Sequence, residues 1–365
     1  MMRVLITGGA GFIGSHLADE LITRGCTVRA LDALVPQVHG SDRMRPAYLA
    51  PEVELVVGDI RDPATVKQAL DGVDVVYHFA ARVGVGQSMY EIAEYTSVNN
   101  RGTAVLLEAL VEKPVRRLIV ASSMSIYGEG LYRDRSDRTH GDVQRTPEQL
   151  ARREWDPPGL APVPTPEWKA PTLQSVYALS KYDQERMCMI IGNAYRIPTV
   201  ALRFFNVYGT RQSLSNPYTG VLAIFASRYL NDKPPLVFED GRQRRDFVHV
   251  KDVVSACWLA LAADGAVGHV FNVGSGRELT IREVAQHMAR VLGKDIAPEI
   301  TGQVRVGDIR HCTADISLAR KVLGYEPKVD FDRGLAELAR WLRDQSATDR
   351  VDTMRQELMA RGLAR

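Results

Sequence analysis

The 365-residue sequence lacks the features of several large protein classes. It has no run of about 18 apolar residues, and its start, MMRVLITGG, carries no leader of basic and then apolar residues, so neither a membrane span nor a secretory signal is predicted. Lys and Arg number 46 against 44 Asp and Glu, which leaves a formal net charge of only +2 and indicates no basic surface for nucleic acid. We therefore expect a cytosolic protein with neither a nucleic-acid nor a membrane partner.

Cysteine is also scarce, with only Cys26, Cys188, Cys257 and Cys312 in the chain. These residues are far apart, and they form neither a CxxC pair nor a CxxC…HxxxH spacing. A zinc site and a disulfide framework are thus both unsupported. We expect four buried free thiols and no bound metal.

What the sequence does contain is a repeated alternation of apolar strands and helices. Strands are predicted at Arg3–Thr7, Thr27–Leu31, Glu54–Ile60, Asp74–Ala81, Arg117–Ser123 and Thr199–Gly209. Helices are predicted between them, at Phe12–Arg24, Pro63–Leu70, around Val98–Leu110, and at Val176–Tyr195. This alternation predicts an α/β fold with a doubly wound parallel sheet of the Rossmann type, whose ligands bind at the carboxyl ends of the strands.

The chain length and a change of pattern after Gly209 predict two domains. Residues 1–205 would form the Rossmann domain and residues 206–365 a smaller mixed α/β substrate domain, with 246–275 returning to the first sheet. Within the first domain, Glu129–Thr172 carries fifteen charged residues and seven of the eighteen prolines without sustained periodicity. We expect an irregular insertion there, at the rim of the active site.

A glycine-rich turn follows the first strand. Gly8, Gly11 and Gly14 of GGAGFIG allow the backbone to approach a pyrophosphate, which then lies at the N-terminus of the following helix. The motif stands at the first strand-to-helix junction, where a dinucleotide site needs it. The turn residues Phe12 and Ile13 are expected to contact the same ligand.

Two carboxylates predict the identity of that dinucleotide. Asp32 ends the second strand, eighteen residues after Gly14, where it would bind the adenosine ribose and repel a 2′-phosphate, which favours NAD over NADP. Asp59, with Ile60 beside it, ends the third strand and could meet the adenine amino group. The alternative for Asp59 is a cap of the helix from Pro63, although Asp62 is better placed for that role.

Three polar residues form the candidate catalytic group. Tyr177 and Lys181 lie four apart on one face of a predicted helix, and Ser123 ends a sheet strand. With the dinucleotide turn, they resemble the serine, tyrosine and lysine of the short-chain dehydrogenase/reductase superfamily. A nearby ammonium favours the phenolate, so Tyr177 could take a proton from a sugar hydroxyl while Ser123 holds the reacting oxygen. The alternative is a packed helix face without chemistry.

The resemblance extends over nearly the whole chain and narrows to the extended, nucleotide-sugar-modifying branch of that superfamily. The matching segments include TGGAGFIGSHL, VVGDIRD, HFAA, VNNRGT, SSMSIYG, YALSK, RFFNVYG, GRQRRDFVHVKDV and RVGDIRH. The resemblance implies a nucleoside diphosphate sugar as substrate and a homodimer formed through a four-helix bundle of Val98–Leu110 and Val176–Tyr195. It also implies NAD contacts from Phe79, Ala80, Ala81 and Asn99, and substrate contacts from Ser88, Ser125, Asn206, Arg245, Arg305 and Asp308.

The residues after Ser123 discriminate between reactions within the branch. Dehydrating and decarboxylating relatives carry a carboxylate at the next positions, where this chain has Met124 and Ser125, and SSMSIYG lacks the cysteine of relatives that epimerise next to a ketone. The remaining minimal triad favours 4-epimerisation through transient oxidation at C4.

The insertion indicates the substrate. Its segments QLARREW and PVPTPE resemble those of bacterial dTDP-L-rhamnose 4-epimerases, although Trp155–Thr165 lacks their paired cysteines. A UDP-hexose 4-epimerase, a nucleotide-sugar 4-ketoreductase and a non-catalytic nucleotide-binding scaffold are the alternatives. Cys312 matches a position that walls the sugar pocket in UDP-galactose 4-epimerases, or it is an ordinary buried cysteine.

Overall fold

The computed structural model describes residues 1–365 and centres on a seven-stranded sheet of order β14-β9-β5-β4-β1-β2-β3. Every neighbouring pair in this sheet is parallel. The strands are β1 (Arg3–Thr7), β2 (Thr27–Asp32), β3 (Glu54–Val57), β4 (Val75–His78), β5 (Arg117–Ser123), β9 (Thr199–Phe204) and β14 (Val270–Val273). The predicted doubly wound Rossmann sheet is confirmed.

Helices cover both faces of this sheet because its central strands are apolar on both sides. Successive residues of β1 alternate between two cores: Val4 and Ile6 belong to one, and Leu5 to the other. The larger core packs against α1 (Phe12–Thr23) and α10 (Val250–Ala262), and the smaller against α3 (Pro63–Ala69), α6 (Gly102–Glu112) and α8 (Val176–Tyr195). Each fully buried Leu, Ile or Val side chain contributes about 1.5–3 kcal/mol, so this pattern holds the strand ends in place.

The predicted strand Thr199–Gly209 is divided in two. The backbone N–H of Phe205 still donates to Val273 in the central sheet, but that of Asn206 donates to Asp246. Asn206 begins a separate strand, β10 (Asn206–Tyr208), which pairs in parallel with β13 (Phe247–His249) outside the central sheet. The change of partner places Asn206 at the carboxyl edge, between the two parts of the molecule.

Helix α6 also starts differently from the prediction. A π-helical turn, Thr96–Arg101, precedes it and contains Asn99. Such turns insert one extra residue into the helix and re-aim the side chains around it. Helix α8 agrees with its predicted bounds: the Ser175 side chain accepts from Ala178 N at its start, and Arg196 ends it in the left-handed conformation.

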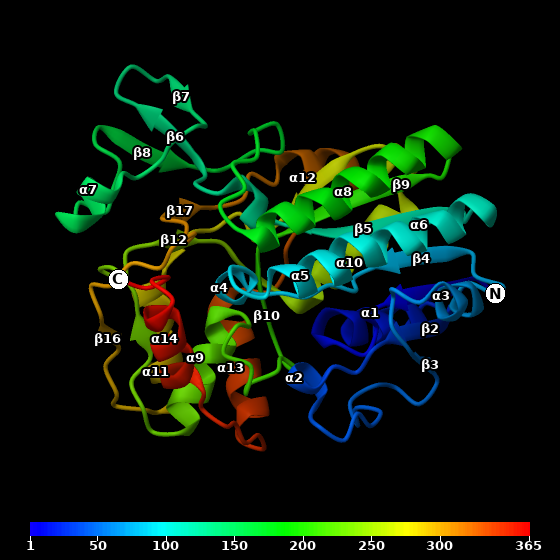
Figure 1. Cartoon of the computed structure of the whole chain (residues 1–365), viewed down its shortest axis with the longest axis horizontal. Helices are drawn as coiled ribbons and strands as arrows, with labels where there is room; N and C mark the ends of the chain where they lie inside the picture. The colour runs from blue at the N-terminus through cyan, green and yellow to red at the C-terminus, as the bar shows by residue number, and fades with distance from the viewer.

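The insertion is more ordered than the sequence indicates. It forms a three-stranded antiparallel sheet of β7 (Thr139–His140), β6 (Leu131–Asp134) and β8 (Leu160–Val163). Helix α7 (Pro147–Ala151) lies in the chain between β7 and β8 and stands beside this sheet in Figure 1. Strands of two to four residues are too short for a detectable period. The expectation of an irregular insertion was therefore wrong, because tertiary contacts rather than local pattern order this segment.

The remaining elements form the smaller part of the molecule. Helices α9 (Val221–Leu230), α11 (Ile281–Leu292) and α13 (Phe331–Leu342) surround a separate apolar core. Beside them lie a sheet of β15 (Leu279–Thr280), β12 (Arg244–Arg245) and β17 (His311–Cys312), and a pair of β11 (Leu236–Val237) and β16 (Glu299–Ile300). Short helices α2 (Pro36–His39), α4 (Val85–Ser88), α5 (Ile92–Tyr95) and α12 (Ser317–Leu323) and the last helix, α14 (Val351–Ala360), complete the fold. None of the helices is long and apolar enough to cross a bilayer.

Candidate active site

A cavity of about 510 Å³ opens at the carboxyl edge of the central sheet. Eleven of the predicted cofactor residues line it: Gly8, Gly11, Phe12, Ile13, Gly14, Asp32, Asp59, Ile60, Phe79, Ala80 and Ala81. Ser123, Tyr177 and Lys181 line the same cavity. The sheet topology thus brings the candidate catalytic group and the candidate dinucleotide site into one space.

The glycine turn leaves no room for side chains where a pyrophosphate would approach. Gly8 has φ +71°, and a Cβ there would lie 3.0 Å from the backbone N of Ala80. A Cβ on Gly14 would lie 2.5 Å from the carbonyl oxygen of Gly8. Helix α1 begins after Gly11 without a side-chain cap, so its first N–H groups stay available to an anion. The residues present therefore fit a dinucleotide.

Asp32 is held in place for recognition of a ribose. Its Oδ2 accepts from the backbone N of Ala10 at 3.1 Å, and its Oδ1 accepts from that of Leu34 at 2.9 Å. These bonds fix the carboxylate at the end of β2, on the cavity wall. A negative charge fixed there disfavours a 2′-phosphate, as NAD selectivity requires.

Asp59 forms an ion pair that the sequence reasoning missed. Arg61 donates to its carboxylate from Nε at 2.9 Å and from the terminal nitrogen at 2.6 Å, and these hydrogen bonds lower the pKa of Asp59. Arg61 also lines the cavity and binds Glu94 at 3.2 Å. Asp62 caps α3 by accepting from Ala64 N and Thr65 N, so the cap alternative for Asp59 is excluded. The proximity of Arg61 within GDIRD was the available signal.

Ser123, Tyr177 and Lys181 are buried or partly buried where the strand β5 meets α8. Burial raises the pKa of Tyr177, and its interaction with the Ser123 side chain acts in the opposite direction. Burial lowers the pKa of Lys181 to about 8. Ser125 donates to Ser123 Oγ at 2.9 Å, which orients the serine hydroxyl. The three side chains thus line one cavity, and the hydroxyl of Tyr177 interacts with that of Ser123.

Lys181 has a buried partner that the sequence reasoning also missed. Its Nζ donates to Gln184 Oε1 at 2.7 Å. The Gln184 amide nitrogen donates in turn to Thr103 Oγ1 at 2.9 Å and to the carbonyl of Ala80 at 3.3 Å. The spacing of three residues on α8 was the available signal for the contact between Lys181 and Gln184. The contacts of Gln184 with Thr103 and Ala80 depend on tertiary packing.

A second cavity of about 240 Å³ adjoins the first. It is lined by five of the predicted substrate residues: Ser125, Asn206, Arg245, Arg305 and Asp308. Met124, Ser125, Asn206 and Tyr218 line both cavities, so the two spaces meet beside the catalytic group. The amide oxygen of Asn206 is buried there without a hydrogen-bond partner, which a polar ligand would supply.

Asp308 organises the two arginines of this second cavity. Its Oδ2 accepts from Arg305 at 2.8 Å, and its Oδ1 lies 3.5 Å from Arg245. Burial alone would raise the pKa of Asp308, but the two positive charges hold it below its usual value. The Arg305 guanidinium also lies over the Phe238 ring, 4.4 Å from its centre. Paired arginines of fixed orientation suit the oxygens of a diphosphate.

Two predicted contacts lie outside both cavities. Ser88 is fully buried and its hydroxyl donates to the carbonyl of Val85 at 2.7 Å. Asn99 is fully buried in the π turn, where its amide bonds the backbone of Arg82 and the hydroxyl of Ser180. The structure therefore does not bring these two side chains to either ligand. They support the loop of residues 82–85 that borders the cavity.

All four cysteines are free and buried, as predicted. Cys312 packs in the larger core and lines neither cavity, so the alternative of an ordinary buried cysteine holds. No group of three or more His, Cys, Asp and Glu side chains is arranged to hold a metal ion.

Comparison with known proteins gives one consistent family. The NAD dependent epimerase/dehydratase family matches residues 4–149 and 158–274. The chain is 34% identical to a dTDP-L-rhamnose 4-epimerase of Burkholderia thailandensis, over 94% of this chain and 95% of that protein.

Solved structures agree with this match. A Thermotoga maritima UDP-glucose 4-epimerase with UDP-glucose superposes with a TM-score of 0.78 at 31% identity, over 94% of this chain and 99% of that one. A Thermus thermophilus UDP-glucose 4-epimerase with NAD gives 0.76 at 32% identity, over the same shares. With a cavity that fits a dinucleotide beside a serine, a tyrosine and a lysine, the chain belongs to the NAD-dependent epimerase/dehydratase family of nucleotide-sugar enzymes.

Proposed function

We propose that this protein is a 4-epimerase of a dTDP-6-deoxyhexose such as dTDP-L-rhamnose. The observation that carries the proposal is the composition of the wall where the two cavities meet. Met124 and Ser125 line both cavities, Ser123, Tyr177 and Lys181 line the first cavity beside them, and the carboxylates of the two linings lie elsewhere. Asp308 is engaged by arginines, Asp32 and Asp59 belong to the dinucleotide end, and Glu94 is paired with Arg61 beside Asp59. Dehydration or decarboxylation needs a carboxyl beside the sugar, whereas epimerisation at C4 does not.

In this mechanism Tyr177 is the base. Its phenolate takes the proton of the sugar C4 hydroxyl while Ser123 holds the same oxygen by a hydrogen bond. Lys181, as an ammonium, favours the phenolate by its charge. NAD, which the glycine turn, Asp32 and Asp59 would hold, would supply reversible hydride transfer at C4. The 4-keto sugar exposes its other face before Tyr177 gives the proton back, so the sugar is inverted at C4 with no net oxidation.

The two cavities divide the binding of cofactor and substrate. We infer that residues 1–205 hold NAD through the glycine turn, Asp32 and Asp59. Residues 206–365 would bind the nucleotide sugar through Asn206, Arg245 and Arg305. Within them, segment 246–275 adds strand β14 to the first sheet and packs helix α10 on one face of that sheet. The diphosphate would lie against the two arginines, and the sugar would reach Tyr177.

Met124 and the likeness to the Burkholderia enzyme support a 6-deoxy sugar. The Met124 side chain lies directly after Ser123 and lines both cavities, so it offers an apolar surface suited to a C6 methyl group. A UDP-hexose 4-epimerase is the second candidate, because the T. maritima structure holds UDP-glucose.

Substrate comparison separates these candidates. We expect kcat/KM for dTDP-L-rhamnose to exceed that for UDP-glucose by about tenfold or more, the discrimination that a few lost contacts produce. Equal or greater efficiency with UDP-glucose would favour the second candidate. Stoichiometric consumption of NADH with a 4-keto sugar would instead indicate a ketoreductase.

We further propose a homodimer formed through α6 and α8. Leu179 and Ile190 are 45% and 56% exposed, which is unusual for such side chains. They are eleven residues apart, which is close to three turns, so they share one face of α8. A pair of such helices from each subunit would bury this face in a four-helix bundle.

A further inference from the structure

The last helix of the chain supplies part of the wall of the second cavity. Val351, Met354 and Leu358 of α14 recur at helical spacing, are at most 4% exposed, and line this cavity. Leu363 beyond the helix lines it too. Their small apolar core, which also contains Leu236, is separate from the other cores of the molecule. Figure 1 shows α14 (red) beside α9 and α11, on the side of the molecule away from the N-terminus.

The residues after α14 hold the backbone on both sides of Arg305. Val304 N donates to Arg365 O at 2.8 Å, and Arg365 N donates to Val304 O at 2.9 Å. Val306 N donates to Leu363 O at 2.9 Å. Arg305 thereby pairs with Ala364 in a short antiparallel bridge. The last residues therefore fix the backbone from which the Arg305 side chain extends toward Asp308.

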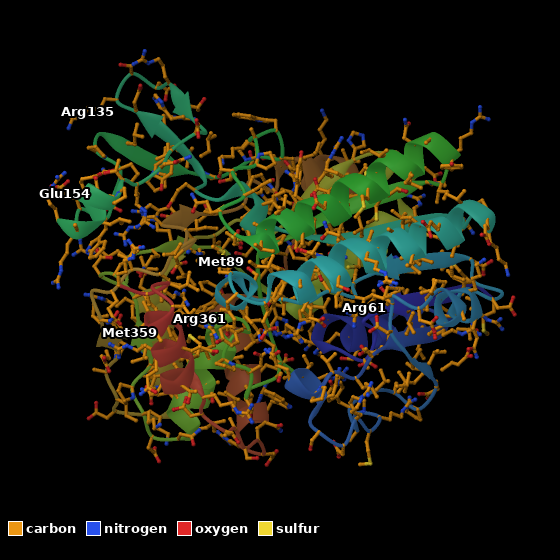
Figure 2. The ribbon with its side chains drawn as sticks, viewed as in Figure 1. Arg61, Met89, Arg135, Glu154, Met359 and Arg361 are labelled. Atoms are coloured by element: carbon orange, nitrogen blue, oxygen red, sulfur yellow. The ribbon has the colours of Figure 1, made fainter.

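A polar cluster attaches α14 to the rim of the same cavity. The hydroxyls of Tyr90 and Tyr218 share a hydrogen bond of 2.5 Å, and both lie within hydrogen-bond distance of Glu357 Oε2, at 3.2 and 3.1 Å. Tyr218 lines both cavities, so this cluster joins the helix directly to the site. The Arg361 guanidinium lies over the Tyr90 ring, 4.2 Å from its centre. Figure 2 labels Arg361 and Met359 on this part of α14.

We propose that two parts of segment 351–365 belong to the nucleotide-sugar site, with separate tasks. Met354 and Leu358 form an apolar wall that selects the nucleotide sugar by size and shape. Leu363–Arg365 position Arg305 on the diphosphate. The proposal rests on the proposed function of the second cavity, and it adds specificity-determining and positioning residues to that cavity.

The wall is tested by matched substitutions on one helix. Leu358→Ala and Met354→Ala should each raise KM for the nucleotide sugar about tenfold and leave kcat within about twofold, because contacts are lost in binding alone. Met359→Ala is the control, since Met359 is 48% exposed and lines neither cavity, and its KM should not change. Leu358→Phe, which keeps an apolar residue but changes its shape, should also raise KM. Unchanged KM in all three wall variants would overturn the wall's role.

The positioning role is tested by a double-mutant cycle. Deletion of residues 363–365 should raise KM for the nucleotide sugar about tenfold. Arg305→Ala should then raise KM by a much smaller factor in the shortened protein than in the full chain. If Arg305→Ala raises KM by the same factor in the full-length and the shortened protein, the last residues do not position Arg305. If the deleted protein does not fold, Leu363→Pro, which alters this segment without removing it, replaces it in the cycle with the same expectation.

Each measurement includes NAD content and the activity of the unaltered protein. An inactive unaltered protein on every nucleotide sugar would refute the proposed function. If the unaltered protein is active and the variants in segment 351–365 have the same KM, only the role of this segment is refuted.

Discussion

Gln184 allows a direct test of how the buried lysine is tuned. The perturbation is Gln184→Leu, which keeps the approximate volume but removes the oxygen that accepts from Lys181 Nζ at 2.7 Å. Gln184 is fully buried and Lys181 is 3% exposed, so solvent replaces little of this contact. A hydrogen bond to a charged group contributes about 1.5–3 kcal/mol, and one pKa unit corresponds to about 1.4 kcal/mol. The pKa of Lys181, about 8 in the present environment, should then fall to about 6 to 7.

The sign of the effect on activity follows from the charge. The ammonium form of Lys181 promotes ionisation of Tyr177, so activity falls as the pH rises through the pKa of the lysine. The assay is kcat/KM against pH, which reports groups of the protein before it binds the sugar. Gln184→Leu should lose about 5- to 50-fold at pH 8 and about twofold or less at pH 6.

Gln184→Glu is the matched control. It retains an acceptor and adds a negative charge beside Lys181, which raises the pKa of the lysine and moves the alkaline limb to higher pH. If both variants reduce kcat/KM equally at every pH, Gln184 acts only on folding and the reasoning is refuted. Thermal unfolding of each variant identifies that case.

The remaining predictions concern other parts of the molecule. Tyr177→Phe should lower kcat by about 10²–10⁴ while NAD stays bound, measured by product formation and by the absorbance of the purified protein. Asp32→Asn should weaken NAD binding and bring the dissociation constants of NAD and NADP closer together in titration calorimetry, and an unchanged ratio would contradict the ribose role. Arg310→Ala should lower the free energy of unfolding, measured in urea, by about 3–5 kcal/mol, because Arg310 is fully buried among three carboxylates. As a control, Arg135→Ala on the exposed edge of the insertion (Figure 2) should change this free energy by less than about 0.5 kcal/mol. Ile190→Glu should convert a dimer into a monomer in light scattering, and a wild-type monomer at micromolar concentration would contradict the proposed interface.

Local signals predicted most residues that line the cavity at the carboxyl edge of the first sheet, although β3 ends at Val57 and β4 at His78, each three residues before its predicted end. The glycine turn, Asp32 and the strand bounds depend on residues adjacent in the chain, where backbone geometry and apolar patterning are direct. The spacing of Tyr177 and Lys181 likewise survives in α8, because it depends only on the helical period.

Contacts between distant segments were not predictable in the same way. Arg310 joins Asp156 of the insertion to Glu239 and Asp240, and Gln184 meets Thr103 across two helices. Such partners depend on tertiary packing, for which one sequence carries no periodic signal. The division of Thr199–Gly209 has the same origin, because the backbone of Asn206 exchanges one strand partner for another.

The role of segment 351–365 shows the difference most clearly. The spacing of Val351, Met354 and Leu358 places them on one face of a helix, and all three side chains are buried. It does not indicate what the face touches. Only the fold shows that it borders the cavity that contains Arg305.

The central claim is that C4 is oxidised and then reduced by return of the same hydride. It is tested most directly with dTDP-L-rhamnose deuterated at C4, incubated with the purified protein without added NADH, and analysed by mass spectrometry and NMR. The mechanism predicts an equilibrium mixture of C4 epimers in which the product retains deuterium at C4. Loss of the label to solvent, or product formation only in proportion to added NADH, would contradict it.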